Sequence, residues 1–435
     1  MTENIKQLLM VAFLLVPSFF LRWEYVNNTK IIEPLRADAY AYTMVAKNLA
    51  FDHVFTSKPD HHGKPSHDGR PPGYPFFLAL IFFLTGSLQA FYYSTLLVQC
   101  FIGASTVVLV YILAGFLLPR PWAFLAALLT ALSPHMIAMS AYILSESLFT
   151  FLLLLAVVLI VWACKKVSAW RFLLAGGVLG LAVFVRPTLA IFPLLCAPII
   201  FFFKKDERKS QVWVALALFL FASYSLPASW SIWRTASLGF DTVQASQFKT
   251  ALVAGFYPGI TYKDLPGMPY REDPGFQQKM AKDYPDLARH LVKIIQEDPG
   301  RYLGWWLVGK PVMFWSWKVF FSDGINFYPI EYSWFDINPV MKMLRTVMLG
   351  IHPVLVILAF IGVVFFCRGQ FREPTAMVAY LLCFILVAHF TLMFMALAPF
   401  PRYALPLGPE LYVMSVFSLW KMTTFVKERR SSLVP

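Results

Sequence analysis

Charged residues are scarce in this chain of 435 residues. Asp, Glu, Lys and Arg make up 14% of it, whereas a soluble domain carries about 25%. Hydrophobic residues make up 58%, and the mean hydropathy is +0.62. Apolar runs of about 20 residues, the length that crosses a bilayer, recur along the chain. The scarcity of charge excludes an ordinary soluble domain and predicts an all-α polytopic membrane protein.

Motifs of common enzyme classes are also missing. The chain contains no GxxxxGK[ST], GxGxxG, HExxH or GxSxG pattern. Their absence argues against a bound nucleotide, a metalloprotease site and a serine nucleophile of the familiar type. The five cysteines lie in or beside apolar runs without CxxC spacing. We interpret them as small buried hydrophobic residues, with neither disulfides nor metal ligands implied.

A metal site is the one cofactor that the sequence leaves open. Four histidines share one polar stretch with three acids: His53, His61, His62 and His67 with Asp52, Asp60 and Asp68. Their spacing matches no compact metal-binding motif, and a His-His pair in a polar loop is usually solvated. We predict that the protein uses no cofactor, with a divalent metal in this stretch as the alternative.

Apolar segments indicate about ten transmembrane helices, within a range of about 9 to 12. They lie roughly at 7–25, 91–118, 122–141, 146–164, 169–185, 188–203, 211–229, 345–366, 374–396 and 402–420. The first has no small-residue cleavage site, so we expect a retained span with Lys6 inside. The later basic clusters all fall on the cytoplasmic side only if the apolar run 73–89 does not cross. We therefore expect that run to form a helix lying at the outer membrane interface.

This topology divides the chain into three parts. Residues 1–229 form a transmembrane module whose first outer loop is 26–90. Residues 230–344 form a large outer segment, and 345–435 hold the last spans. Within the outer segment, apolar residues recur at helical spacing (Leu287, Leu291, Ile294 and Ile295) and are followed by Trp305, Trp306, Trp315 and Trp317. Since Trp favours the membrane–water boundary, we expect surface-lying helices there.

Two residues of the first outer loop suit chemistry on a phosphate ester. Asp38 begins the stretch DAYAYTMVAKNL, near the start of a short helix, where it is either a general base or an ordinary helix-start acid. Arg70 precedes two prolines in DGRPPGYP. Its planar guanidinium suits a phosphate, although a snorkelling surface arginine is the alternative.

Three more charged residues are predicted on the same outer side. Glu146 opens a span in LSESLF, Arg186 ends one in FVRPT, and Arg402 begins the last one in PRYALPLG. Each alone is a common residue at the end of a span. Their shared side, together with Asp38 and Arg70, predicts one polar site at the outer membrane surface.

The net charge of +13 mostly marks cytoplasmic helix ends, and it also suits an anionic partner such as a lipid headgroup or a phosphate-bearing substrate. No basic stripe lies on a soluble part of the chain, which argues against nucleic acid. The ordered motifs RADAYAYTMVAKNLA, RPPGYP, SPHMIAMSAYILSESLF, FVRPT and PRYALPLGPELY resemble the GT-C superfamily of integral-membrane glycosyltransferases. The nearest branch holds the aminoarabinose transferases and the protein O-mannosyltransferases. The resemblance covers about residues 1–190 and 400–415.

The resemblance implies transfer of a sugar from a polyprenyl phosphate to a lipid, glycan or protein acceptor, with inversion at the anomeric carbon. Asp38 matches the catalytic loop acid, and Glu146 matches a second acid. Arg70 matches the position that binds the leaving phosphate, with Arg186, Arg402 and Tyr74 in the same phosphate-binding set. Some relatives place two acids side by side, but Ala39 follows Asp38 here.

The resemblance also implies an enzyme embedded in membrane lipids, and we expect it in a bacterial inner membrane with its site facing the exterior. A transporter or flippase of a lipid-linked sugar is the alternative function. It predicts charges in the middle of spans and internal repeats, and the sequence shows neither. A non-catalytic assembly subunit is a third possibility.

Overall fold

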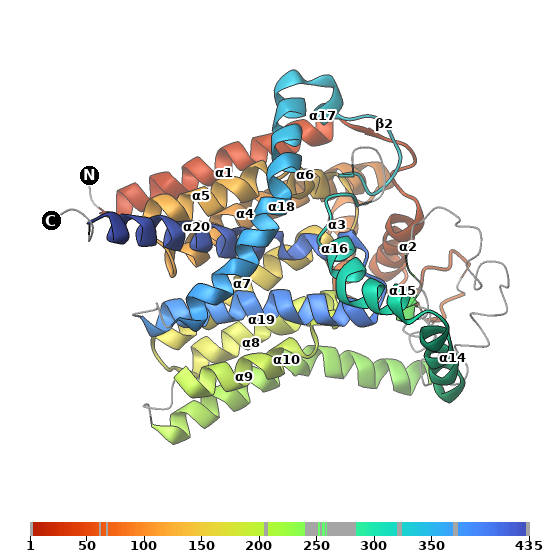
Figure 1. The fold of residues 1–435 in the computed structure, drawn as a ribbon. Coiled ribbons are helices and arrows are strands. Elements are labelled where there is room, and N and C mark those ends of the chain that lie inside the picture. Colours follow the sequence, from red (N-terminus) through yellow and green to blue (C-terminus); the bar gives the residue numbers. More distant parts are fainter. Residues whose placement is uncertain are drawn as a thin grey trace.

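The computed structural model describes residues 3–60, 62–66, 68–203, 208–239, 251–252, 255–256, 258, 284–319, 324–368 and 373–431. Helices form nearly all of the regular structure, and the two strands are very short. The long helices pack side by side, with both chain ends at one end of the bundle (Figure 1). The all-α class predicted from the sequence is confirmed.

Six helices have the length and hydropathy to cross a membrane. They are α1 (Glu3–Asn27), α4 (Leu88–Gly115), α7 (Glu146–Lys165), α10 (Lys209–Leu238), α18 (Pro339–Cys367) and α19 (Pro374–Ala396). The other expected spans correspond to α5 (Arg120–Leu132), α8 (Ala169–Val185), α9 (Phe192–Phe203) and α20 (Gly408–Ser431). By length and composition alone, the described residues contain six spans, or seven if the bent pair is one span, and the count of about ten stays a prediction.

Two expected spans differ from their sequence prediction. The span at 122–141 is broken between α5 and α6 (Pro134–Ala138) by a bend of 54°. Pro134 starts the second piece, because proline lacks the N–H that would continue the helix. The span expected from residue 402 begins at Gly408 instead. Two 3₁₀ turns precede it, η4 (Pro401–Tyr403) and η5 (Leu405–Leu407), and each begins where a proline limits helix growth.

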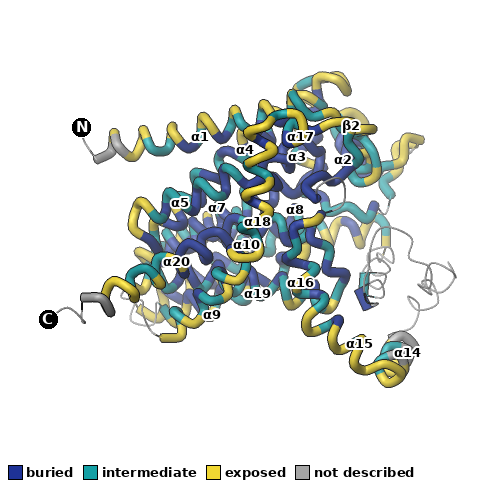
Figure 2. The backbone as a smooth tube through the Cα atoms, turned by 45° about the horizontal axis from the view of Figure 1, so that its top comes forward, coloured by how far each residue is buried: buried dark blue, intermediate teal, exposed yellow. Residues whose placement is uncertain are grey.

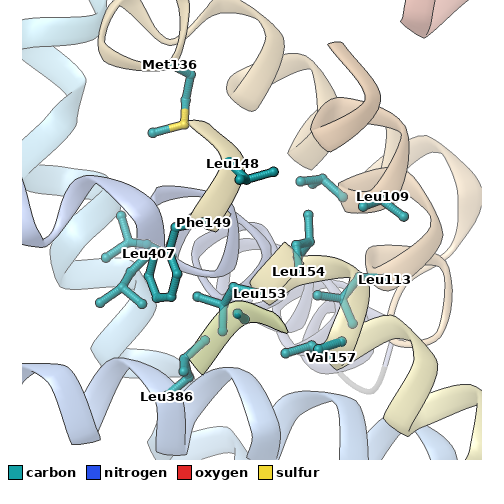
Figure 3. Packing of buried hydrophobic residues seen from close by; sticks show 14 of the residues in the cluster. Leu109, Leu113, Met136, Leu148, Phe149, Leu153, Leu154, Val157, Leu386 and Leu407 are labelled. Atoms are coloured by element: carbon teal, nitrogen blue, oxygen red, sulfur yellow. The ribbon is translucent and has the colours of Figure 1, made fainter. Parts of the chain in front are cut away.

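The core of the bundle lies around α7. Its apolar side chains, including Phe149, Leu153 and Val157, pack between Leu113 of α4 and Leu386 of α19 (Figure 3). Figure 2 shows α7 as mostly buried, whereas α1 and α10 carry many exposed positions. Exposed apolar side chains on such helices are expected where lipid tails replace water. Among the six long apolar helices, α7, whose first residue is Glu146, is the most buried.

Two short helices lie at the end of the bundle opposite to the termini (Figure 1). They are α2 (Ala37–Phe51) and α3 (Gly73–Thr85), and they pack on each other. At a rise of 1.5 Å per residue, the 13 residues of α3 extend about 20 Å, less than the roughly 30 Å of a bilayer core. This length agrees with the interfacial helix expected from the apolar run 73–89.

A two-stranded antiparallel ribbon joins the first outer loop to the later outer segment. Strand β1 (Lys30–Ile31) pairs with β2 (Ile330–Tyr332). Below the ribbon, Asn326 Oδ1 accepts hydrogen bonds from Tyr25 Oη at 2.9 Å and Tyr142 Oη at 2.8 Å. Segments about 300 positions apart in the sequence are thereby held together.

The described part of the later outer segment contains several short helices besides strand β2, and their position at the membrane surface stays a prediction. They are α14 (Tyr284–Glu297), α15 (Pro299–Gly304), the π-turn η3 (Trp305–Gly309), α16 (Lys310–Phe314) and α17 (Trp334–Ile337). The helices α14 and α15 are largely exposed (Figure 2). Leu291 and Ile295 pack against a small cluster that contains Trp305, whereas the side chains of Leu287 and Ile294 lie outside the described residues.

Candidate active site

Five charged side chains from separate elements meet at the end of the bundle opposite to the termini. They are Asp38 in the first turn of α2, Arg70 before α3, Glu146 at the start of α7, Arg186 after α8 and Arg402 in η4. Arg70 Nη1 lies 2.7 Å from Asp38 Oδ1, and Arg402 Nη1 lies 2.9 Å from Asp38 Oδ2. Arg402 Nε lies 2.5 Å from Glu146 Oε1, which Arg186 Nη2 also contacts at 2.8 Å. The structure thus brings together every charged residue selected from the sequence.

Asp38 is held by a constrained piece of backbone. The preceding residue, Ala37, has a φ of 46°, in the left-handed region that a residue with a Cβ rarely adopts. The next residue, Ala39, donates its N–H to Tyr328 Oη at 3.3 Å. Strained backbone of this kind persists where the surrounding structure determines it, and such positions are common at functional sites. The Asp38 side chain remains 28% exposed, so a substrate can reach its carboxylate.

Arg70 is fixed by the proline corner that follows it. Its backbone N–H donates to Asp68 Oδ1 at 3.1 Å, and its guanidinium lies 5.5 Å from the centre of the Tyr42 ring. A side chain at Gly73 would come within 2.7 Å of the backbone of Val185, so only glycine allows α3 to begin against the end of α8. The motif RPPG therefore sets both the position of Arg70 and the contact of its loop with the bundle.

Glu146 forms the buried end of the cluster. Its side chain is 1% exposed, compared with 12% for Arg186 and 13% for Arg402. Arg186 also donates from Nε to Ser145 Oγ at 3.2 Å. Among the described residues, Glu146 Oε2 has no hydrogen-bond partner. A buried carboxylate between two guanidinium groups is expensive to disturb, because removing it leaves buried charges without a partner.

Arg402 connects the two carboxyl groups. It contacts Asp38 through one nitrogen and Glu146 through another, and its guanidinium lies 5.5 Å from the centre of the Phe327 ring. Burial alone would lower the pKa of Arg402, but the adjacent Glu146 and Asp38 carboxylates raise it well above its ordinary value. Arg402 is therefore a permanent positive charge at the centre of the cluster.

Tyr74 lies behind the cluster. Its side chain is fully buried, and its hydroxyl donates to Gln99 Oε1 at 2.8 Å. Its ring meets the Tyr42 ring edge-on, with centroids 5.0 Å apart. Tyr42 in turn supports Arg70. The Tyr74 hydroxyl is thus engaged with Gln99, and Tyr74 contacts the charged cluster through the ring of Tyr42.

Sequence reasoning missed the aromatic walls of the site. Tyr42 could have been found, since it lies four residues after Asp38 and therefore on the same face of a helix. Burial and the negative charge of Asp38 raise the pKa of Tyr42, so its hydroxyl stays neutral. Phe327 and Tyr328 carried no readable signal, because they lie in the outer segment nearly 290 residues from Asp38. The β1–β2 ribbon and the hydrogen bonds of Asn326 to Tyr25 and Tyr142 hold that segment at the site.

The proposed alternative metal stretch is only partly described. His53 and His62 are described, whereas His61 and His67 lie outside the described residues. No group of three or more His, Cys, Asp or Glu side chains suited to a metal ion occurs in the part of the chain that the structure describes. The prediction that the protein uses no cofactor stays a prediction.

The charged cluster carries an excess of positive charge. Three guanidinium groups face two carboxyl groups, so the cluster keeps one positive charge in excess when both acids are ionised. It lies at one end of a bundle in which six of the described helices are long and apolar enough to cross a membrane. A helical bundle with such a cluster at one end resembles the GT-C class of folds expected from the sequence.

Comparisons with known proteins agree with this class. The sequence profile of the family described as Dolichyl-phosphate-mannose-protein mannosyltransferase matches residues 69–233. The fold is similar to that of the archaeal oligosaccharyltransferase AglB from Archaeoglobus fulgidus, solved in complex with an inhibitory peptide and a dolichol-phosphate. That similarity has a TM-score of 0.51 at 15% identity and covers 99% of this chain and 52% of AglB.

A second similar structure is ArnT from Cupriavidus metallidurans bound to undecaprenyl phosphate. The TM-score is 0.50 at 13% identity, and the match covers 96% of this chain and 60% of ArnT. The chain therefore spans little more than half the length of these two proteins. No curated protein sequence matches the chain. The resemblance to the GT-C superfamily is confirmed, and the chain is an integral membrane protein with the GT-C fold.

Proposed function

We propose that the protein is a glycosyltransferase that moves a sugar from a polyprenyl-phosphate donor to an acceptor hydroxyl at the end of the bundle that carries α2 and α3. The observation that carries this proposal is the position of Asp38. Its carboxylate is partly exposed and lies between Arg70 and Arg402, so a base and two phosphate ligands meet at one point. The GT-C fold supports the same assignment.

In the proposed reaction, the acceptor oxygen attacks the anomeric carbon as Asp38 removes the acceptor proton. A carbon–oxygen bond forms on one face of the sugar, and the bond to the phosphate oxygen breaks on the other. The electron pair leaves with the lipid phosphate, and the configuration inverts. Since phosphate is a good leaving group once its charge is neutralised, positioning and electrostatics can supply much of the catalysis.

Arg70 and Arg402 would hold the departing phosphate. An arginine carries five N–H donors, and the ion pair of Arg70 with Asp38 engages only Nη1. The Arg70 side chain is 33% exposed and is therefore the most accessible cation of the cluster. Glu146 and Arg186 lie deeper, and we assign them the task of holding Arg402 in place rather than contact with the reacting atoms.

A groove beside the cluster offers room for the lipid part of the donor. It has a volume of about 210 Å³ and is lined by Pro71, Pro72 and Pro187, the prolines that follow Arg70 and Arg186 in the sequence. Its remaining wall consists mostly of apolar and aromatic side chains of α8 and α10, including Phe184 and Trp230. An isoprenoid chain needs such a surface, because the groove would bury it away from water.

The location of the enzyme follows from the same proposal. The positive-inside rule favours a cytoplasmic position for the end that carries both termini, so the site would face the exterior, for example a bacterial periplasm. AglB and ArnT were solved with dolichol-phosphate and undecaprenyl phosphate, which supports a polyprenyl carrier for this chain. The acceptor would be a lipid, a glycan or a protein that reaches the outer surface.

Replacement of Asp38 tests the proposal. Asp38→Asn keeps the size of the side chain and removes the base, so transfer should fall by about 10²- to 10⁴-fold. Transfer from polyprenyl-phosphate sugars is measured by mass spectrometry of cell-envelope glycans and proteins in a deletion strain complemented with each variant. Asp336→Asn, an exposed acid paired with Arg345, is the matched control and should keep full activity. Near-normal transfer by Asp38→Asn would refute the assignment.

A further inference from the structure

Lys310 is a buried basic residue that makes no ion pair with the charged cluster among the described residues. It begins α16, and its side chain is completely buried. Its Nζ donates to the carbonyl oxygens of Met395 at 2.5 Å and Leu397 at 3.3 Å, and it lies 3.8 Å from the centre of the Trp306 ring. A lysine is rarely buried without a specific task, because moving an ammonium group out of water is costly.

One carbonyl that Lys310 binds, that of Met395, belongs to the last turn of α19, and the other belongs to Leu397, which follows the helix directly. Such carbonyls lack helical N–H partners, and a positive charge at a helix C-terminus also stabilises the helix dipole. Lys310 therefore acts as a cap supplied by a distant part of the chain. It fixes the end of a helix whose next residues lead directly to Arg402.

The connection from α19 to Arg402 is short and stiff. The sequence between Leu397 and Arg402 is Ala-Pro-Phe-Pro, and each proline fixes one backbone angle. The Phe394 ring of α19 stacks on the Tyr403 ring at 4.7 Å and on the Phe314 ring of α16 at 5.3 Å. A shift of the end of α19 would therefore move Arg402 relative to Asp38.

The outer segment also contacts Leu397 and Ala398, the residues that follow α19, through Gly255, Phe256 and Trp305. Trp305 Nε1 donates to the Gly255 carbonyl at 3.1 Å. A Cβ on Gly255 would collide with the Leu397 carbonyl, so the two backbones are in direct contact. Phe256, Trp305 and Ala398 form one buried cluster. The Trp-rich part of the outer segment thus packs directly on the residues that lead to Arg402, and Lys310 is buried at this contact.

We infer that Lys310 is a positioning residue that sets the place of Arg402 in the site. The inference rests on the proposed function, because it matters for activity only if Arg402 binds the lipid phosphate. Lys310 touches neither Asp38 nor Glu146 and acts through the α19 C-terminus. Through Lys310, the outer segment also supports Arg402, the proposed ligand of the phosphate. The same segment lies where we expect an acceptor to approach.

A double-mutant cycle on the full chain in detergent tests this inference, with undecaprenyl phosphate as the probe. Lys310→Met keeps the length of the side chain and removes its donors, so affinity should fall by about tenfold. Lys310→Arg restores charge and donors and should bind within about threefold of the wild type. In an Arg402→Gln background, Lys310→Met should have almost no further effect, because the two changes act through one contact.

Lys293→Met is the matched control, since Lys293 is exposed on α14, and its affinity should stay at the wild-type value. If Lys310→Met does not fold, Lys310→Gln takes its place in the cycle under the same criteria. Wild-type affinity in the folded variant, or a full multiplicative loss in the Arg402→Gln background, would overturn the inference. If Arg402→Gln itself binds normally, both the inference and the phosphate role of Arg402 fail.

Discussion

The two halves of the charged cluster use the same chemistry in different surroundings. Asp38 and Arg70 are 28% and 33% exposed, whereas Glu146 and Arg186 are 1% and 12% exposed. Arg402 joins the halves. Exposure decides what a charge can do: the outer pair can exchange partners with a substrate, and the inner pair cannot without desolvation costs. We therefore assign the outer half to the reaction and the inner half to holding its geometry.

The comparison predicts its largest stability effect at Glu146. Glu146→Gln removes the buried negative charge that Arg186 and Arg402 share, which should lower the free energy of unfolding by about 3–5 kcal/mol. Thermal unfolding of the purified protein in detergent measures the loss. Glu331→Gln is the matched control, because Glu331 forms an exposed ion pair with Lys30 that is worth at most about 1 kcal/mol. Similar losses of stability in both variants would show that the buried ion pairs of Glu146 stabilise the protein no more than an exposed ion pair does.

Substitutions in the exposed half, Asp38 and Arg70, should change substrate binding and activity more than the free energy of unfolding. Arg70→Ala should weaken binding of undecaprenyl phosphate by about thirtyfold, or about 2 kcal/mol, while the unfolding temperature changes little. Arg70→Lys should recover part of the affinity, since an ammonium supplies charge without the planar fork. Lipid-phosphate binding to the purified variants measures both effects. Arg301→Ala on the exposed helix α15 should bind normally, and equal weakening there would point to a general charge effect.

Tyr74 tests whether a residue behind the cluster supports the structure or contacts the phosphate. Tyr74→Phe removes the donor to Gln99 and should cost about 1–2 kcal/mol of unfolding free energy. Affinity for undecaprenyl phosphate should change less than twofold if the residue only supports Tyr42. A large loss of affinity with normal stability would instead restore the direct phosphate contact expected from the sequence.

The most gradual effect concerns pH. Burial lowers the pKa of Lys310 to about 7, whereas an unfolded lysine titrates near about 10.4. Between these values the unfolded chain binds more protons than the folded chain, so stability rises with pH. The unfolding temperature of the wild type relative to Lys310→Met should therefore increase from about pH 7 to pH 10. A constant difference in unfolding temperature between the two proteins across that range would mean that burial does not lower the pKa of Lys310.

Local patterns in the sequence were sufficient for the elements that carry the site. Proline and glycine in RPPG mark the start of α3, the acid in ADAY marks the first turn of α2, and hydropathy marks the long helices. The number of spans was harder to predict. Hydropathy reports composition but not bends or helix length, so the break after α5 and the late start of α20 did not follow from it.

The sequence by itself determined that this is a helical membrane protein and which charged residues lie at the ends of its helices. Composition and periodicity act locally, and the bilayer permits few other structures. Only the tertiary structure decided the pairing: that Arg402 bridges Asp38 and Glu146, that Tyr328 reaches Ala39, and that Lys310 caps α19. These contacts join residues from 85 to 364 positions apart, and no local pattern encodes such distances, because they depend on how whole helices pack.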